Sequence, residues 1–144
     1  MNLGPGTLQG NLTNNGTLAP GNSPGAIAVT GNYAQSPGAQ MLMELAGTAP
    51  EDFDTLSISG SATLGGTLKI SLLDNFLPSP IDSFPILTAA ALLGHFDTIT
   101  TDAGSFDVLY SPNSVTLTNF SPVPEPTAML LLSAVPLLSR RRRR

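Results

Sequence analysis

Glycine and proline punctuate this chain so densely that long regular elements have little room to form. The 144 residues include 14 Gly and 13 Pro, and only 11% are charged. A typical globular chain has about 12% Gly plus Pro and roughly 25% charged residues. Pro breaks helices and sheet interiors, and Gly weakens both. The sequence therefore predicts one domain of short strands and tight turns, without long helices.

Between these breaks, apolar residues recur at every second position, which is typical of half-buried strands. Residues 1–40 predict brief strands separated by turns such as Asn15-Gly16 and Pro20-Gly21. Residues 89–93 form a short apolar run, for which we expect a wide loop with a buried face. The residues expected to point inward are Met41, Met43, Leu45, Leu56, Ile58, Leu68, Ile70, Leu72, Phe84, Ile86, Leu87, Phe96, Ile99, Phe106, Val115 and Leu117. This pattern predicts an all-β fold.

Composition excludes several classes of function. The chain has no Cys and a single His, His95, which excludes a disulfide scaffold, a thiolate metal site, a cysteine nucleophile and any site with two imidazoles. Residues 1–139 contain ten acidic residues, and their one Lys or Arg is Lys69. Because little in this body could neutralise phosphates, we expect no nucleic-acid partner.

Two kinds of polysaccharide chemistry can be tested against the remaining residues. A lyase needs a base beside the sugar, but Lys69 lies between inward positions and should face solvent, and His95 lies in a Gly-His-Phe turn. A glycoside hydrolase needs two carboxylates about 5 to 9.5 Å apart. Asp52 and Asp54 would share a strand face, and the other candidates are Asp97, Asp102 and Asp107. Nothing in the sequence brings these carboxylates together, so we expect a solvated acidic surface and no catalytic residues.

A metal or cofactor site is not expected either. The run Glu51-Asp52-Phe53-Asp54 is acidic, but it lacks the ligand spacing and the glycine of a calcium-binding loop. The Gly-rich turns have neither the helix start nor the lysine of a phosphate-binding loop. We therefore expect no metal and no cofactor.

The end of the chain differs in kind from the body. Two prolines stiffen Val123-Pro124-Glu125-Pro126, residues 127–139 carry no charge, and five arginines follow. As a helix, the uncharged stretch would reach about 20 Å, short of the roughly 30 Å hydrocarbon core, and Pro136 weakens it further. It predicts a marginal membrane segment with its arginine end on the cytoplasmic side.

These three parts, in this order, resemble the PEP-CTERM sorting signal of exported bacterial proteins. The resemblance implies an exosortase, a membrane-embedded transpeptidase-like enzyme, as a partner that processes the chain near its Pro-Glu-Pro motif. It also implies transient anchoring in the inner membrane. The motif is Pro124, Glu125 and Pro126; the membrane segment contains Ala128, Met129, Leu130, Leu131, Leu132, Val135, Leu137 and Leu138; the stop-transfer cluster is Arg140, Arg141, Arg142, Arg143 and Arg144.

The body resembles the repeats of autotransporter passenger domains. The segments that carry this likeness are 16–25, 29–35, 53–68 and 94–97. The resemblance implies a right-handed parallel β-helix over residues 1–120, followed by a Pro-rich linker (121–126) and a short hydrophobic helix with its Arg cluster (127–144). Turn residues at the corners and alternating strands are consistent with a solenoid.

Taken together, these features predict an exported, non-catalytic structural or adhesive protein of the cell envelope, surface or extracellular matrix, associated with exopolysaccharide. The alternative is the C-terminal cap and sorting tail of a carbohydrate-active β-helix enzyme whose catalytic coils lie upstream. A third possibility is a small protein that its tail anchors permanently. Residues 1–30 show no signal peptide, so we expect Met1 to begin partway through a longer protein whose last coils are residues 1–120.

Overall fold

The computed structural model describes residues 6–20 and 25–122. Strands dominate this part of the chain, and its helical element is a single 3-10 turn, η1 (Pro50–Asp52). The all-β prediction is therefore confirmed. The hydrophobic helix expected within residues 127–144 lies outside the described residues.

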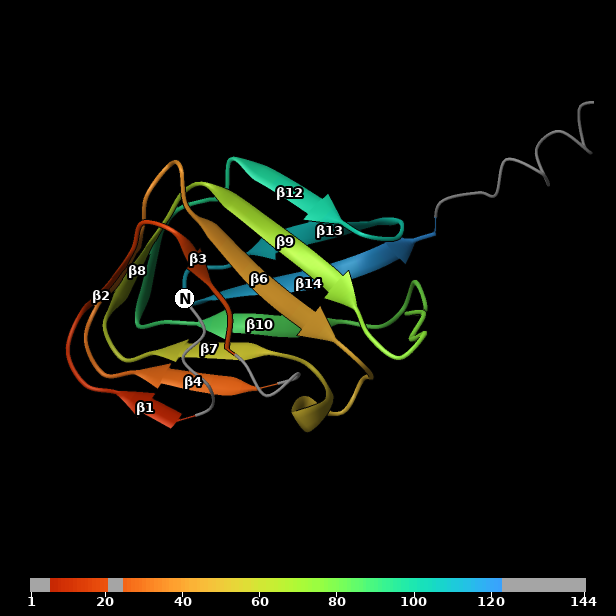
Figure 1. Cartoon of the computed structure of the whole chain (residues 1–144), viewed down its shortest axis with the longest axis horizontal. Coiled ribbons are helices and arrows are strands. Elements are labelled where there is room, and N and C mark those ends of the chain that lie inside the picture. The colour runs from red at the N-terminus through yellow and green to blue at the C-terminus, as the bar shows by residue number, and fades with distance from the viewer. Residues whose placement is uncertain (1–5, 21–24, 123–144) are drawn as a thin grey trace, which may run out of the picture.

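The first twelve strands are laid out as four coils of three. They are β1 (Gly6–Leu8), β2 (Leu12–Asn14) and β3 (Thr17–Leu18); β4 (Ala26–Val29), β5 (Tyr33–Gln35) and β6 (Gln40–Leu45); β7 (Thr55–Ile58), β8 (Ser61–Leu64) and β9 (Thr67–Leu72); and β10 (Phe84–Thr88), β11 (Ala91–Gly94) and β12 (Thr98–Thr101). Equivalent strands of successive coils pair in parallel, in the orders β1-β4-β7-β10, β2-β5-β8-β11 and β3-β6-β9-β12. Figure 1 shows the resulting three walls around a common interior.

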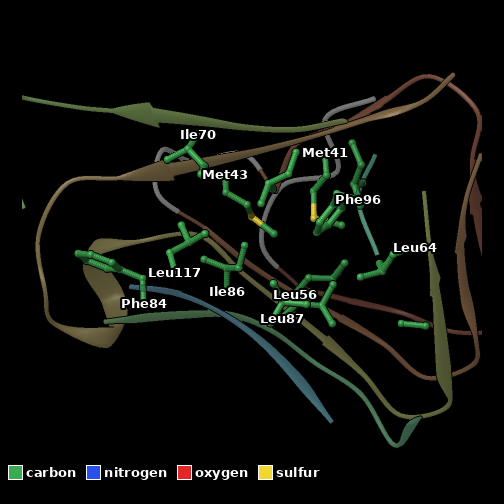
Figure 2. Close-up of a cluster of buried hydrophobic side chains, with 14 of the residues drawn as sticks. Met41, Met43, Leu56, Leu64, Ile70, Phe84, Ile86, Leu87, Phe96 and Leu117 are labelled. Carbon is green, nitrogen blue, oxygen red and sulfur yellow. The ribbon is translucent and has the colours of Figure 1, made fainter. Parts of the chain in front are cut away.

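The register of these walls explains why alternation predicted the core. Ile27, Leu56 and Leu87 are aligned across three coils of the first wall, and Met41 and Leu68 are aligned in the third. Side chains in register point to the same side of a sheet, so one inward position repeats from coil to coil. These five side chains are all buried. The interior is therefore a column of stacked apolar residues (Figure 2).

The last two strands depart from the expected parallel stacking. β13 (Ser105–Tyr110) and β14 (Ser114–Ser121) form an antiparallel hairpin, and β14 also pairs antiparallel with β10. A bulge between Pro85 and Leu87 interrupts this second pairing, and both Ile86 and Leu87 are buried. A bulge allows consecutive side chains to enter the core, because it disturbs the alternation. The hairpin thus extends the first wall beyond the fourth coil.

Aromatic residues fill the core beside this hairpin. The ring of Phe84 meets those of Phe53, Phe76 and Phe106 edge to face, at centroid distances of 5.4, 6.0 and 6.1 Å. Phe106 in turn lies 4.9 Å from Phe120 of β14. Edge-to-face pairs add to the stabilisation that comes from burial. Phe84 therefore links the hairpin to the third and fourth coils.

The loop expected over residues 89–93 is wrong. Ala91–Gly94 is strand β11, which pairs in parallel with β8, and of the earlier run Ala89 is buried. Most of β11 is exposed, but Leu92 is half-buried and packs against the core, in register with buried Ala62. The backbone N–H of Leu92 donates to Pro112 O at 2.9 Å. This places the hairpin turn against β11.

Candidate functional site

The corner between the first and second walls is built from glycines that stack closely. The N–H of Gly60 donates to Gly31 O at 2.9 Å and so joins two coils of this stack. A Cβ on Gly31 would lie 2.6 Å from Gly10 O, and one on Gly60 would lie 2.7 Å from Gly31 O. Neither glycine has a positive φ. Their role is therefore close approach between coils.

A ladder of side-chain amides runs beside these glycines. Asn11 Oδ1 accepts the backbone N–H of Asn32 at 2.8 Å, and Asn32 Oδ1 accepts that of Ser61 at 2.9 Å. Each coil therefore caps the corner of the next, which satisfies backbone donors that would otherwise need water. The ladder is exposed, so it also forms part of the surface.

The next corner contains a buried polar network. Tyr33 Oη donates to Gln35 Oε1 at 2.6 Å and accepts from Asn14 Nδ2 at 3.2 Å. Gln35 Nε2 donates to Gly65 O at 2.7 Å, and Asn14 Nδ2 donates to Gln40 O at 2.9 Å. Burial raises the pKa of the Tyr33 phenol well above its ordinary value. The network joins three coils and is structural, because its side chains are buried.

The outward side chains form rows that cross all four coils. One row on each wall is in register: Thr7, Ala28, Ser57 and Thr88 on the first; Thr13, Ala34, Thr63 and Leu93 on the second; and Thr17, Gln40, Thr67 and Thr98 on the third. Neighbouring strands lie about 4.8 Å apart, so equivalent groups repeat at that spacing. We refer to these three sets as the outward rows. They consist of uncharged residues, most of which are small.

Asp54 is buried, contrary to the expected solvated surface. Its carboxylate is 0% exposed and accepts the N–H of Gly25 at 2.5 Å and that of Glu44 at 2.8 Å. Burial raises its pKa to about 6, against the lowering effect of those two hydrogen bonds, and nearby Glu44 adds to the rise. Asp54 therefore fastens the third coil to the second.

The expected shared strand face of Asp52 and Asp54 is also wrong. Asp52 ends η1, which begins at Pro50, and Asp54 lies between η1 and β7. The chain at Phe53 makes an antiparallel bridge with Leu45. Because the 3-10 turn interrupts the alternation, the two carboxylates lie in different local structures.

Each of the other candidate acids binds a neighbouring segment. Asp97 accepts the N–H of Gly66 at 2.9 Å, and Asp102 accepts Ser71 Oγ–H at 3.1 Å and Leu72 N–H at 3.2 Å. Asp107 accepts the side-chain amide of Asn119 at 2.9 Å. These carboxylates belong to different corners and strands, and the structure gives each one a partner from a separate segment.

Both basic candidates lie on the surface, Lys69 as alternation predicted and His95 as its Gly-His-Phe turn predicted. Lys69 is exposed between buried Leu68 and Ile70. His95 is exposed in the corner before β12, and its ring lies 6.0 Å from that of Tyr110. Burial raises the pKa of Tyr110, whose hydroxyl accepts the N–H of Phe96 at 3.1 Å. Both surface assignments are confirmed.

A cavity that was not among the sequence-based expectations lies beside the β9–β10 loop. It measures about 390 Å³ and is lined by Leu72, Asn75, Phe76, Leu77, Asp102 and Ala103. Asp74 and Asn75 in this loop both have positive φ, at 54° and 59°. The hydrogen bonds of Asp102 tie the β12–β13 turn to the start of the loop. An Asp-Asn pair in an otherwise apolar stretch was the one available signal, because both residues tolerate the left-handed region.

The residues of the expected sorting signal lie outside the described residues: Pro124, Glu125, Pro126, the apolar positions 128–138 and Arg140 to Arg144. Across residues 6–20 and 25–122, no helix has the length and apolar character needed to cross a membrane. In the same ranges, His, Asp and Glu nowhere gather as a group of three or more that could hold a metal ion. Comparison with protein-family models, curated proteins and solved structures found no match to this chain.

Proposed function

We propose that this protein is an exported, non-catalytic structural or adhesive component of the cell envelope, surface or extracellular matrix. The observation that carries the proposal is the order of three features at the end of the sequence: the Pro-Glu-Pro motif, an uncharged apolar stretch and five terminal arginines. Through its likeness to the PEP-CTERM signal, this order makes an exosortase the processing partner and the inner membrane a transient anchor.

The body that such a tail would deliver is suited to a scaffold. Its coils stack in parallel walls, and we take the class to be a right-handed parallel β-helix, since parallel crossover connections are right-handed in about 98% of cases. Most residues of the outward rows have hydrogen-bonding side chains, which recur at the strand spacing. A repeating surface favours a repeating partner, and exopolysaccharide is the partner that the sorting signal suggests.

The tail can be tested separately from the body. Replacement of Arg140 to Arg144 by Ser should abolish retention at the inner membrane, because nothing positive would then hold the C-terminus on the cytoplasmic side. The matched control replaces Lys69 by Ser, which removes an exposed charge from the body and should leave retention unchanged. Unaltered membrane fractionation of the arginine variant would refute the stop-transfer role.

Mass spectrometry of the C-terminus of the mature protein decides between processing and permanent anchoring. Processing near Pro124–Pro126 predicts a mature chain without the arginines. Persistence of Arg140 to Arg144 in the mature chain would contradict processing and favour a small protein that its tail anchors permanently.

One observation favours the alternative role as the end piece of a larger β-helix enzyme. The hairpin of β13 and β14 reverses direction against the fourth coil, and solenoids use atypical terminal elements as caps. The two roles differ in what precedes residue 1 in the gene. Further low-charge repeats with a signal peptide support the scaffold, whereas coils with clustered Asp, Arg and Lys support the enzyme.

A further inference from the structure

The cavity beside the β9–β10 loop is an open hollow of the surface whose volume falls in the range of small-ligand sites. Ligand pockets typically measure about 300 to 1,000 Å³ and combine apolar walls with a few placed polar groups. This cavity, at about 390 Å³, has Leu72, Phe76 and Leu77 as apolar walls and Asn75 and Asp102 as polar groups. Neither the outward rows nor the sorting signal accounts for it.

The walls of the cavity are held in place. Phe76 packs edge to face on buried Phe84, and its N–H donates to Leu73 O at 2.8 Å. Asp102 bridges to Leu72 N–H, and Asp82 Oδ2 accepts Ser79 N–H at 2.8 Å farther along the loop. Two consecutive left-handed residues, Asp74 and Asn75, belong to the same loop, and both residue types tolerate this conformation. A preformed wall reduces the ordering cost of binding.

Charge restricts what this cavity can bind. Among its six lining residues the ionisable group is the carboxylate of Asp102, and none of them is Lys, Arg or His. Uronic acids, phosphates and sulfates would meet an uncompensated negative charge. Asp102 uses Leu72 N–H and Ser71 Oγ–H as donors, and a carboxylate can accept about four hydrogen bonds. Asn75 adds a carboxamide with both donors and an acceptor.

We propose that this cavity binds a neutral sugar residue of a polysaccharide. Hydroxyl groups donate to Asp102 and exchange hydrogen bonds with Asn75, while the apolar face of the ring packs on Phe76 and Leu77. The lining has both the hydrogen-bond acceptors and the apolar surface that an uncharged, polyhydroxylated ring requires. The choice of a polysaccharide as the source of the sugar rests on the proposed extracellular role, but the chemistry of the cavity does not.

The test is an NMR titration of the intact 144-residue chain with cellohexaose and mannohexaose. Addition of either sugar up to about 10 mM should shift the amide resonances of residues 72–77 and 101–104, with an affinity in the millimolar range. Oligogalacturonate and CaCl2 serve as anionic and cationic probes, and neither should shift those resonances. Shifts from either of these probes equal to those from the neutral sugars would overturn the assignment, and so would no response to both neutral sugars.

A matched pair of variants in the same loop separates the cavity from the loop as a whole. Leu77 and Ile81 are exposed by 63% and 91%, and of the two Leu77 lines the cavity. Leu77→Ser should weaken sugar binding about tenfold, as expected for loss of an apolar contact, whereas Ile81→Ser should leave it unchanged. Equal losses in both variants would refute the site. Because the titration uses purified protein, its failure would leave the export proposal standing, and a failed export test would leave sugar binding intact.

Discussion

The buried carboxylate of Asp54 makes stability depend on pH in an unusual direction. Its pKa lies at about 6 in the folded chain, against an ordinary value of 3.8 in an unfolded one, because burial disfavours the charged form. Protonation therefore favours the folded state. The contribution of this group to stability is fully present below pH 3.8 and is lost as the pH rises through about 6.

The size of this loss follows from the two pKa values. One pKa unit corresponds to about 1.4 kcal/mol, so the shift from 3.8 to about 6 corresponds to at most about 3 kcal/mol of unfolding free energy. Such a loss is a large fraction of the roughly 5 to 15 kcal/mol that stabilises a typical domain. Glu44, which adds to the pKa rise, contributes the smallest of its causes. Glu44→Gln should therefore reduce the pH dependence without removing it.

Asp54→Asn isolates this effect, because the other carboxylates titrate in both proteins and cancel in the difference. The amide can accept the N–H of Gly25 or of Glu44, but it turns a donor toward the other, which costs about 1 to 3 kcal/mol. The variant should therefore be less stable than the natural chain at pH 4, and the gap should close or reverse by pH 7. Urea unfolding followed by far-UV circular dichroism at pH 4, 5, 6 and 7 measures the gap. A gap that stays constant or widens with pH would refute the raised pKa.

Two further substitutions test the corners. Gly60→Ala should destabilise the chain by about 1 to 3 kcal/mol through overpacking against Gly31 O. The control Gly38→Ala should be neutral or slightly stabilising, because an added Cβ there meets nothing within 4 Å. Urea midpoints compare the two variants, and equal effects would contradict close stacking. Tyr33→Phe should lower the free energy of unfolding by about 1 to 3 kcal/mol, because it removes the hydroxyl bonded to Asn14 and Gln35 while preserving the ring. Thermal unfolding measures this loss, and an unchanged melting temperature would mean that the hydroxyl makes no net contribution.

Alternation predicted the core wherever one strand carries an uninterrupted period of two. Met41, Met43 and Leu45 are all buried, as are Leu68 and Ile70 across the next turn. The prediction is local, because each inward row requires only that neighbouring coils repeat the same pattern. It fails where tertiary pairing sets the structure. β11 is a strand because β8 lies beside it. Its sequence does not alternate between apolar and polar residues.

The polar interior could not be predicted in the same way. Asp54 was expected on the surface because isolated acids are rarely buried. Its burial depends on backbone donors at Gly25 and Glu44, which approach it only after the coils have stacked. The cavity depends likewise on the meeting of residues 72–77 with 102–103. Short-range sequence patterns carry no information about such contacts between segments.

The low charge of this sequence can be explained by the stacking of its coils, so it does not by itself indicate a partner. In a parallel stack each outward residue lies beside its equivalent in the next coil, and like charges placed there destabilise the sheet. The charges on the registered strands respect this condition: Lys69 lies between Leu42 and Thr100, and Glu44 lies beside Ser71. Sparse charge on the outward rows therefore follows from the in-register pairing of parallel strands. The evidence for a ligand must come from features that stacking does not require, and the cavity beside Asp102 is such a feature.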